Sequence, residues 1–292
     1  MDTVEPTVAV AIPCLDEEAA IGTVIADFRR ELPAARIVVF DNGSTDRTAQ
    51  IAAGLGVPVV PVKRRGKGYV VQAILETMTE EYVVIVDGDD TYPAAAVHDL
   101  LRCARETQAD MVIGTRATTT GMRRLNRVGN RLLTGILNRF FRTRYRDILS
   151  GFRVVGRDFV RTIPLVTTGF EIETEMNLQA LEHGMIVKEV AIGYKERPAG
   201  SQSKLRALHD GYRILLTMAI LMRDHRPLRM YTLLAACLAL GAAGVAAFVP
   251  PPARSLGGAA LLLAAFLMFT IGLVLNAINT RFRELRLLLK RR

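Results

Sequence analysis

Short apolar runs alternate with longer amphipathic stretches through the N-terminal part of the chain. The runs are rich in β-branched residues and apolar on both faces, which is typical of strands buried inside a parallel sheet. The stretches between them carry apolar residues at helical spacing. We therefore expect an α/β domain with a mainly parallel sheet. The predicted strands are Val8–Ile12, Ile37–Phe40, Val57–Val62, Val83–Val86 and Met111–Ile113, and the predicted helices are Glu17–Leu32, Asp46–Leu55, Gly68–Met78 and Ala94–Thr107.

Two long apolar segments near the C-terminus depart from this alternation. Met230–Val249 and Leu256–Thr280 contain no charged residue, and each is long enough to cross a bilayer, which takes about 20 apolar residues in a helix. The connection between them is short, so the sequence predicts a two-helix transmembrane hairpin with both ends on one side of the membrane. Two buried helices of a soluble protein are the alternative, but neither segment offers a polar face.

Basic residues gather at the two ends of this predicted hairpin. Arg223, Arg226 and Arg229 precede it and a basic tail follows it, whereas the connection carries only Arg254. Because basic loops stay on the cytoplasmic side, we expect a multi-pass protein of the cell membrane with the globular domain and both termini in the cytoplasm. The N-terminus lacks the features of a signal peptide. The predicted parts are a globular domain at 1–226, two transmembrane helices at 227–280 and a basic tail at 281–292.

Three carboxylates, Asp87, Asp89 and Asp90, come directly after the predicted strand Val83–Val86. Open α/β sheets bind their ligands at the carboxyl ends of the strands. Two carboxylates one residue apart can share a hard divalent cation, and such a cation neutralises diphosphate oxygens. The pattern therefore suggests a metal-assisted diphosphate site. A surface turn is the alternative, since turns often contain this motif.

Polar or glycine-rich segments follow three other predicted strands, at Pro13–Glu17, Asp41–Ser44 and Lys63–Gly68. Parallel strands bring such segments to one edge of a sheet, where they can form one site. Neither a dinucleotide fingerprint nor a P-loop is present in these segments. The site suits a nucleotide diphosphate whose phosphates are covered by a metal ion.

The segment Met122–Arg146 interleaves arginines with apolar residues at near-helical spacing. This is the pattern of an amphipathic helix at a bilayer surface, with its arginines directed toward lipid phosphates. A helix packed on the sheet with a solvated basic face is the alternative. Much of the net charge of +9 lies here and beside the apolar segments. We therefore expect anionic lipid, and not nucleic acid, as the partner of this charge.

Seven short motifs follow one another between Val8 and Leu216. They are Pro13-x-x-Asp16-Glu17-Glu18, Asp41-Asn42-Gly43-Ser44-Thr45-Asp46, Gly66-Lys67-Gly68, Asp87-Gly88-Asp89, Gly114-Thr115-Arg116, Ser150-Gly151-Phe152-Arg153 and Arg197-x-x-Gly200-x-x-Ser203-Lys204. This series resembles family 2 glycosyltransferases, most closely the dolichol- or polyprenyl-phosphate mannose and glucose synthases. The resemblance implies a GT-A type nucleotide-sugar-binding domain. It also implies a membrane-bound enzyme that moves a hexose from a nucleotide diphosphate sugar to dolichyl or undecaprenyl phosphate.

The resemblance also implies roles for individual residues on the donor side. Asp87 and Asp89 would bind Mg²⁺ or Mn²⁺, and Thr91 stands where some members place a metal-binding Gln, so water or Asp90 would supply a third ligand. Among Glu171, Glu173 and Glu175, the last best matches the family's acidic position, and the other two are expected to cap a helix. The residues implied to bind the nucleotide sugar are Pro13, Asp16, Glu17, Asp41, Gly43, Lys67, Asp87, Arg197, Ser203 and Lys204.

On the acceptor side the resemblance implies an arginine cluster for a lipid phosphate, since guanidinium groups bind phosphate oxygens bidentately. The expected residues are Arg116, Arg127, Arg131 and Arg153, and the expected catalytic residues are Asp89, Asp147, Arg116 and Lys204. An ionised lipid phosphate needs no strong base to attack, so the transfer would invert the anomeric configuration by single displacement. A glycan or glycolipid hydroxyl is the alternative acceptor, and Asp147 would then be its base. A non-catalytic nucleotide-sugar-binding scaffold is the remaining alternative.

Overall fold

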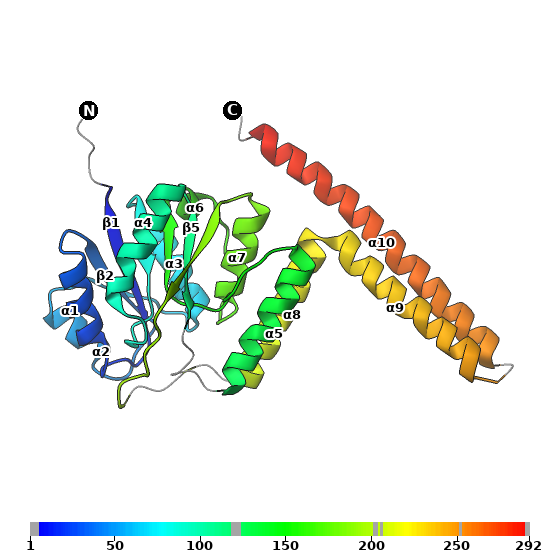
Figure 1. Ribbon diagram of the computed structural model, residues 1–292, viewed down its shortest axis with the longest axis horizontal. Coiled ribbons are helices and arrows are strands. Elements are labelled where there is room, and N and C mark those ends of the chain that lie inside the picture. The colour runs from blue at the N-terminus through cyan, green and yellow to red at the C-terminus, as the bar shows by residue number, and fades with distance from the viewer. Residues whose placement is uncertain (1–5, 118–123, 201–203, 205–206, 251–252, 290–292) are drawn as a thin grey trace. The chain divides into compact units, whose positions relative to one another are not determined.

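A seven-stranded sheet in the order β3-β2-β1-β4-β6-β5-β7 forms the centre of the first of two compact units (Figure 1). The computed structural model describes residues 6–117, 124–200, 204, 207–250 and 253–289. Strand β6 runs antiparallel to both of its neighbours, and the remaining strand pairs are parallel. The strands are β1 (Val8–Cys14), β2 (Arg36–Asp41), β3 (Val59–Pro61), β4 (Tyr82–Ile85), β5 (Met111–Arg116), β6 (Arg153–Gly156) and β7 (Val187–Ile192).

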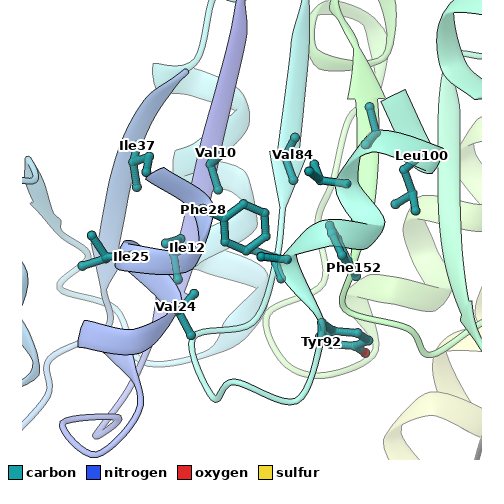
Figure 2. Close-up of a cluster of buried hydrophobic side chains, with 14 of the residues drawn as sticks. Val10, Ile12, Val24, Ile25, Phe28, Ile37, Val84, Tyr92, Leu100 and Phe152 are labelled. Carbon is teal, nitrogen blue, oxygen red and sulfur yellow. The ribbon is translucent and has the colours of Figure 1, made fainter. Parts of the chain in front are cut away.

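Alternate residues of each buried strand supply the two hydrophobic layers on either face of the sheet. Val10 and Ile12 of β1 pack with Phe28 and with helices α1, α2 and α4 (Figure 2). Ala9 and Ala11 of the same strand face the opposite layer, which helices α3, α6 and α7 cover. The helices of this unit are α1 (Ile21–Glu31), α2 (Thr48–Gly54), α3 (Lys67–Thr77), α4 (Val97–Thr107), α5 (Arg124–Phe141), α6 (Arg157–Thr162) and α7 (Ile172–Glu182), and a 3₁₀ turn η1 (Ala94–Ala96) leads into α4.

The structure confirms the predicted strands and helices, with shifts of a few residues at their ends. The largest shift is at α1, which begins at Ile21 and not at Glu17. Residues 17 and 18 instead donate their backbone N–H groups to the side chains of Thr48 and Asp46. These bonds hold residues 17 and 18 beside the start of α2, so helix α1 begins only at Ile21. Of the predicted amphipathic segment Met122–Arg146, residues 124–141 form α5, residues 142–146 follow the helix as a turn and loop, and residues 122 and 123 lie outside the described part of the chain.

The second unit, Met218–Arg292, contains the two long apolar helices. Helices α9 (Pro227–Phe248) and α10 (Ala253–Leu289) pack side by side (Figure 1). A Cβ atom at Gly272 would lie 2.7 Å from the Cβ atom of Tyr231, so glycine permits the close approach. The apolar parts Pro227–Phe248 and Ser255–Phe282 have mean hydropathies of 1.9 and 2.5 and are long enough to span a membrane. Helix α8 (Ala207–His225) crosses the division between the units.

Candidate active site

Acidic side chains follow the carboxyl ends of the parallel strands β1, β2 and β4 at one edge of the sheet. Asp41 is the last residue of β2, and Asp87 and Asp89 lie in the turn that follows β4. That turn packs directly on the end of β1, because a Cβ atom at Gly88 would lie 2.5 Å from Cys14 Sγ. The predicted grouping of these segments at one edge is therefore present in the structure.

Two aspartates hold the turn that follows β2. Asp41 Oδ2 accepts hydrogen bonds from the backbone nitrogens of Gly43 and Ser44, each 3.2 Å long. Asp16 Oδ1 accepts a bond of 2.7 Å from the backbone nitrogen of Thr45. Gly43 has a φ of +78°, in the region that favours glycine. Asp16 and Asp41, the residues expected to hold a base and ribose, thus also fix the shape of the loop.

Arginine and lysine side chains from the segment after β7 reach the acidic edge. Arg197 Nη2 lies 2.5 Å from Asp89 Oδ2, and Arg197 Nη1 lies 3.7 Å from Glu17 Oε1. Lys204 Nζ lies 3.0 Å from the same Glu17 oxygen and donates a bond of 2.7 Å to the carbonyl oxygen of Asp16. The structure therefore brings Arg197 and Lys204 together with the donor-side carboxylates, although they lie far away in the sequence.

Asp89 is held in place by Thr91, whose hydroxyl donates a bond of 2.6 Å to Asp89 Oδ1. Burial and the charge of Asp87 raise the pKa of Asp89, while Arg197 and Thr91 act in the opposite direction. Two neighbouring carboxylates of this kind suit a hard cation such as Mg²⁺ or Mn²⁺. The described residues include no group of three or more His, Cys, Asp or Glu side chains placed to hold a metal. Asp87 and Asp89 are the carboxylates that would hold such a cation.

Lys67 lies between two carboxylates that come from different elements. Its Nζ is 2.6 Å from Asp87 Oδ1 and 2.6 Å from Glu173 Oε1. Burial opposes the charged form, but Asp87 and Glu173 outweigh it and raise the pKa of Lys67 above its usual value. The next residue has to be glycine, because a Cβ atom at Gly68 would lie 2.0 Å from the carbonyl oxygen of Thr167. This close contact fixes where α3 begins and thus where Lys67 stands.

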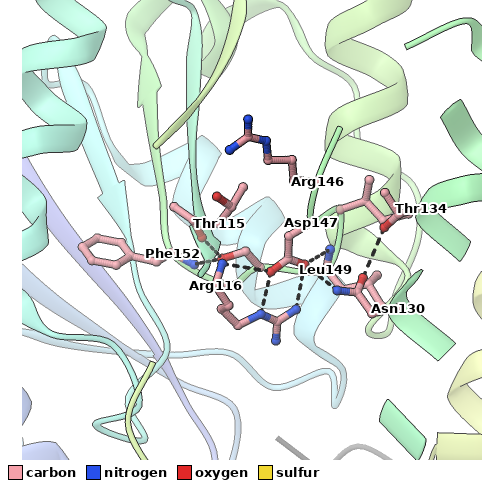
Figure 3. Close-up of polar contacts among 12 residues, drawn as sticks. Thr115, Arg116, Asn130, Thr134, Arg146, Asp147, Leu149 and Phe152 are labelled. Atoms are coloured by element: carbon pink, nitrogen blue, oxygen red, sulfur yellow. Dashed lines mark hydrogen bonds and ion pairs between the residues drawn. The ribbon is translucent and has the colours of Figure 1, made fainter. Parts of the chain in front are cut away.

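Arg116 and Asp147 form a buried bidentate ion pair (Figure 3). The Nε and Nη2 atoms of Arg116 lie 2.6 and 2.7 Å from the Asp147 carboxylate oxygens. Asn130 Nδ2 donates a further bond of 2.9 Å, and the backbone nitrogen of Leu149 one of 3.2 Å. Burial would raise the pKa of Asp147, but the bonds and charge of Arg116 and the bond from Asn130 hold it below its ordinary value. Both oxygens of this carboxylate are therefore engaged.

Helix α5 carries the other two arginines expected to bind a lipid phosphate. Asn130 precedes Arg131 directly and lies three residues after Arg127, so its bond to Asp147 brings this part of α5 to the Arg116 pair. Arg131 is exposed and Arg127 is half-buried. The exposed face of the helix also carries Val128 and Leu132, which are 61% and 59% exposed. Apolar and basic side chains thus share one open face of α5.

Arg153 does not lie where a lipid phosphate would meet it. Its side chain is 1% exposed, and its Nε and Nη2 donate to the carbonyl oxygens of Ser150 and Ile148 at 3.0 Å each. Its Nη1 donates to Asn177 Oδ1 at 2.8 Å. These bonds tie β6 to the neighbouring loop and to α7, so we assign Arg153 to the packing of the domain and leave it out of the acceptor site.

The acidic residues near α7 differ from expectation. Glu175 is fully buried and accepts bonds from the backbone nitrogens of Val166 and Thr167, so it holds that segment. Glu171 pairs with Arg213 at 2.8 Å. Glu173 is the one that reaches Lys67 and hence Asp87. The alternating glutamates indicated in the sequence that one of them reaches the site. Which one does so depends on the rotation of α7 about its axis.

The remaining predicted residues are placed as follows. Pro13 is buried within β1. The side chain of Asn42 bonds the backbone of the segment that leads into α3. Asp90 has a φ of +54° and pairs with Lys195 at 3.1 Å, so it is turned toward the segment after β7. Ser203 lies outside the described residues.

The chain is similar to several known proteins. The family model described as glycosyl transferase family 2 matches residues 9–163. Glycosyltransferase AglJ of Haloferax volcanii is 36% identical over 76% of this chain and 74% of its own length. A dolichyl-phosphate hexose transferase of the same organism is 32% identical over 65% of this chain and 83% of its own. A crystal structure of glucosyl-3-phosphoglycerate synthase from Mycobacterium tuberculosis, with Mn²⁺, UDP-glucose and phosphoglyceric acid, has a TM-score of 0.61 at 21% identity, covering 75% of this chain and 79% of that one.

These matches confirm the GT-A-like fold of the sheet domain and the expectation that the protein is a glycosyltransferase. The chain belongs to glycosyl transferase family 2, since the family model spans more than half of it and a relative above the 30% level of identity aligns over most of it. The structural likeness at 21% identity supports the fold alone.

Proposed function

We propose that this glycosyltransferase transfers a hexose from a nucleotide diphosphate sugar to a polyprenyl phosphate, with inversion, at the cytoplasmic face of the cell membrane. On the donor side, the proposal is supported by the meeting of carboxylates and cations at the sheet edge. The nucleotide would lie against the Asp16 and Asp41 loops, and Asp87 and Asp89 would hold Mg²⁺ or Mn²⁺. Lys67, Arg197 and Lys204 supply positive charge for a diphosphate.

The observation that carries the choice of acceptor is the state of Asp147. A hydroxyl acceptor needs a general base with a free oxygen and a suitable pKa. Asp147, the base that the sequence suggested, has both oxygens engaged by Arg116, Asn130 and Leu149, and its pKa is lowered. A phosphate monoester is already ionised at neutral pH and needs no base. The site therefore suits a phosphate acceptor better than a hydroxyl.

Catalysis would then depend on positioning and charge. Arg116 is fixed by Asp147 and would direct a phosphate oxygen toward the anomeric carbon, with Arg127 and Arg131 of α5 supporting the same group. Lys67, Arg197 and Lys204 would stabilise the negative charge of the departing nucleotide diphosphate. A divalent cation at Asp87 and Asp89 would supply further neutralisation of that leaving group. Attack from the side opposite the leaving group inverts the anomeric centre.

The remainder of the chain agrees with a lipid acceptor. Two helices are long and apolar enough to cross a membrane, and arginines flank them on the side that the positive-inside rule assigns to the cytoplasm. One relative carries the name dolichyl-phosphate hexose transferase, and this chain aligns with 83% of it. A catalytic domain held at the bilayer would meet a lipid phosphate where that phosphate is exposed.

The test is to identify the product. Membranes containing the protein would be incubated with a panel of radiolabelled UDP- and GDP-hexoses together with dolichyl or undecaprenyl phosphate, and the lipids extracted. We expect one sugar to appear as a hexosyl polyprenyl monophosphate, and membranes with Asp89→Asn to form far less of it. Transfer only to a glycan or glycolipid hydroxyl would refute the proposed acceptor.

A further inference from the structure

Glu173 stands next to the proposed metal site without belonging to the predicted set of metal or donor ligands. It lies in the first turn of α7, and its side chain is 7% exposed. Its Oε1 is 2.6 Å from Lys67 Nζ, and the same nitrogen is 2.6 Å from Asp87 Oδ1. Glu173, Lys67 and Asp87 thus form a chain of charges in which one ammonium group is shared by two carboxylates.

The second oxygen of Glu173 is an unused acceptor. Oε2 is buried and has no hydrogen-bond partner among the described residues. A buried carboxylate oxygen without a partner carries a desolvation cost, so it gains from any donor that reaches it. Lys67 carries three N–H donors and is the cation already in contact with this carboxylate.

The position of Lys67 is set by the backbone around it. A Cβ atom at Gly66 would lie 2.1 Å from the carbonyl oxygen of Thr168, and one at Gly68 would lie 2.0 Å from that of Thr167. The backbone nitrogen of Gly68 also donates to the Thr168 carbonyl oxygen at 3.1 Å. The start of α3 is therefore pressed against the segment that leads into α7, which keeps Lys67 beside Glu173.

An ammonium group bonded to a metal ligand competes with the cation for that ligand. Lys67 occupies Asp87 Oδ1, so a divalent cation that binds through this oxygen has to displace the ammonium group. We propose that Glu173 is a positioning residue that takes over the Lys67 ammonium through its open Oε2 and so frees Asp87 for the divalent cation. The inference rests on the proposed function, because it requires the cation to bind at Asp87 and Asp89.

The test measures Mn²⁺ binding directly, with Mn²⁺ alone as the probe and full-length protein in detergent. Glu173→Gln keeps the shape of the side chain but removes the charge that attracts Lys67. We expect the Kd for Mn²⁺ to rise about tenfold, as is common when a residue that supports a metal ligand is lost. Calorimetry or the EPR signal of free Mn²⁺ would measure this Kd. Glu171→Gln is the matched control. It removes one negative charge from the same region, but Glu171 pairs with Arg213 and not with Lys67. The Kd of this control variant for Mn²⁺ should stay within about twofold of the wild-type value, a much smaller change than is expected when a residue that supports a metal ligand is lost.

A second substitution separates the proposed role from simple damage. Adding Lys67→Met to Glu173→Gln removes the competing ammonium, so the double variant should regain the wild-type Kd for Mn²⁺. A merely structural role for Glu173 would leave the affinity low or lower it further. Unchanged binding in Glu173→Gln, or no recovery in the double variant, would overturn the inference while leaving the proposed function intact. A wild-type protein that neither binds Mn²⁺ nor needs a divalent cation for turnover would overturn the inference together with the metal site of the proposed function.

Discussion

At the scale of single residues, three acidic side chains of the donor side have basic partners. Asp89 is paired with Arg197, Glu17 with Lys204 and Asp87 with Lys67. Such pairs hold the carboxylates in fixed positions and keep cations close to where a diphosphate would bind. The same basic groups can exchange a carboxylate for a phosphate oxygen, because both are oxygen anions of similar hydrogen-bonding geometry.

Replacing Asp89 by Asn tests the metal site. The amide keeps the bond to Thr91 but removes the charge that a cation needs, so transfer should fall about a hundredfold or more. Chelator should reproduce the loss in the wild-type protein. Asp99→Asn removes a carboxylate from the exposed surface of α4, where it pairs with Arg102, and should leave the rate unchanged. Initial rates and the far-ultraviolet circular dichroism spectrum would be measured for each. Full activity in chelator would rule out the metal.

Replacing Gly68 by Ala tests the close contact that positions Lys67. The added Cβ atom would meet the Thr167 carbonyl oxygen at 2.0 Å, so the free energy of unfolding should fall by about 1–3 kcal/mol. The affinity for nucleotide sugar should fall as well, because α3 is forced away. Gly54→Ala is the control, since a Cβ atom there meets nothing within 4 Å. Denaturant melts and calorimetric titration would report the two quantities, and equal behaviour of the two variants would contradict the prediction.

Residues of the site were predictable from the sequence where they follow a strand. Asp41, Asp87 and Asp89 have positions fixed by the ends of β2 and β4, so a local pattern locates them. Whether Glu173 or Glu175 faces the site was not predictable, because it depends on how α7 is rotated against the sheet. The burial of Arg153 was missed for a related reason, since a motif match gives no information about which way the side chain points.

At the scale of the elements, periodicity predicted the strands and helices of the first half well. Strand β6 was not predicted, because it is only four residues long and begins with a buried arginine. Strand β7 lies at the edge of the sheet and contains Lys188 and Glu189, so it lacks the continuous apolar run of a central strand. In the structure both strands are defined by their pairing in the sheet, β6 with β4 and β5 and β7 with β5.

Helix α5 gives the prediction that belongs to this scale. Replacing both Arg127 and Arg131 by Ala should raise the KM for polyprenyl phosphate about tenfold or more, because hydrogen bonds to charged groups contribute about 1.5–3 kcal/mol each. The KM for nucleotide sugar should stay close to wild type. Arg102→Ala with Arg105→Ala on α4 removes equal charge from another helix and serves as the control. Steady-state kinetics with each substrate varied in turn would measure this. An unchanged lipid KM would assign α5 the alternative role of a helix with a solvated basic face.

At the scale of the whole molecule, the two units allow the roles of the sheet domain and the apolar helices to be separated. The predicted donor ligands that the structure describes all lie in the first unit, Met1–Thr217. Helix α8 ends at His225. A protein truncated after Arg226 therefore keeps the complete α8 and loses the two apolar helices.

This truncated protein should fold and bind nucleotide sugar with divalent cation as the full chain does. It should transfer sugar to a short, detergent-soluble polyprenyl phosphate but poorly to the long-chain lipid in membranes, because it no longer resides at the bilayer. Calorimetry and turnover with both acceptors would measure this, with the full chain in the same detergent as the reference. A folded fragment without donor binding would show that the apolar helices help to build the site.

The antiparallel strand β6 also has a consequence for how the chain is made. It lies between β4 and β5 in the sheet but follows both in the sequence. Synthesis proceeds at about 5–20 residues per second. Several seconds therefore pass between the synthesis of β4 and that of its sheet neighbour β6. Over that interval the backbone N–H and C=O groups of β4 form an open edge, which can pair with another chain. The growing polypeptide therefore carries this open edge between the emergence of Ile85 and that of Gly156, and a chaperone that covers the edge would protect it from aggregation during this interval.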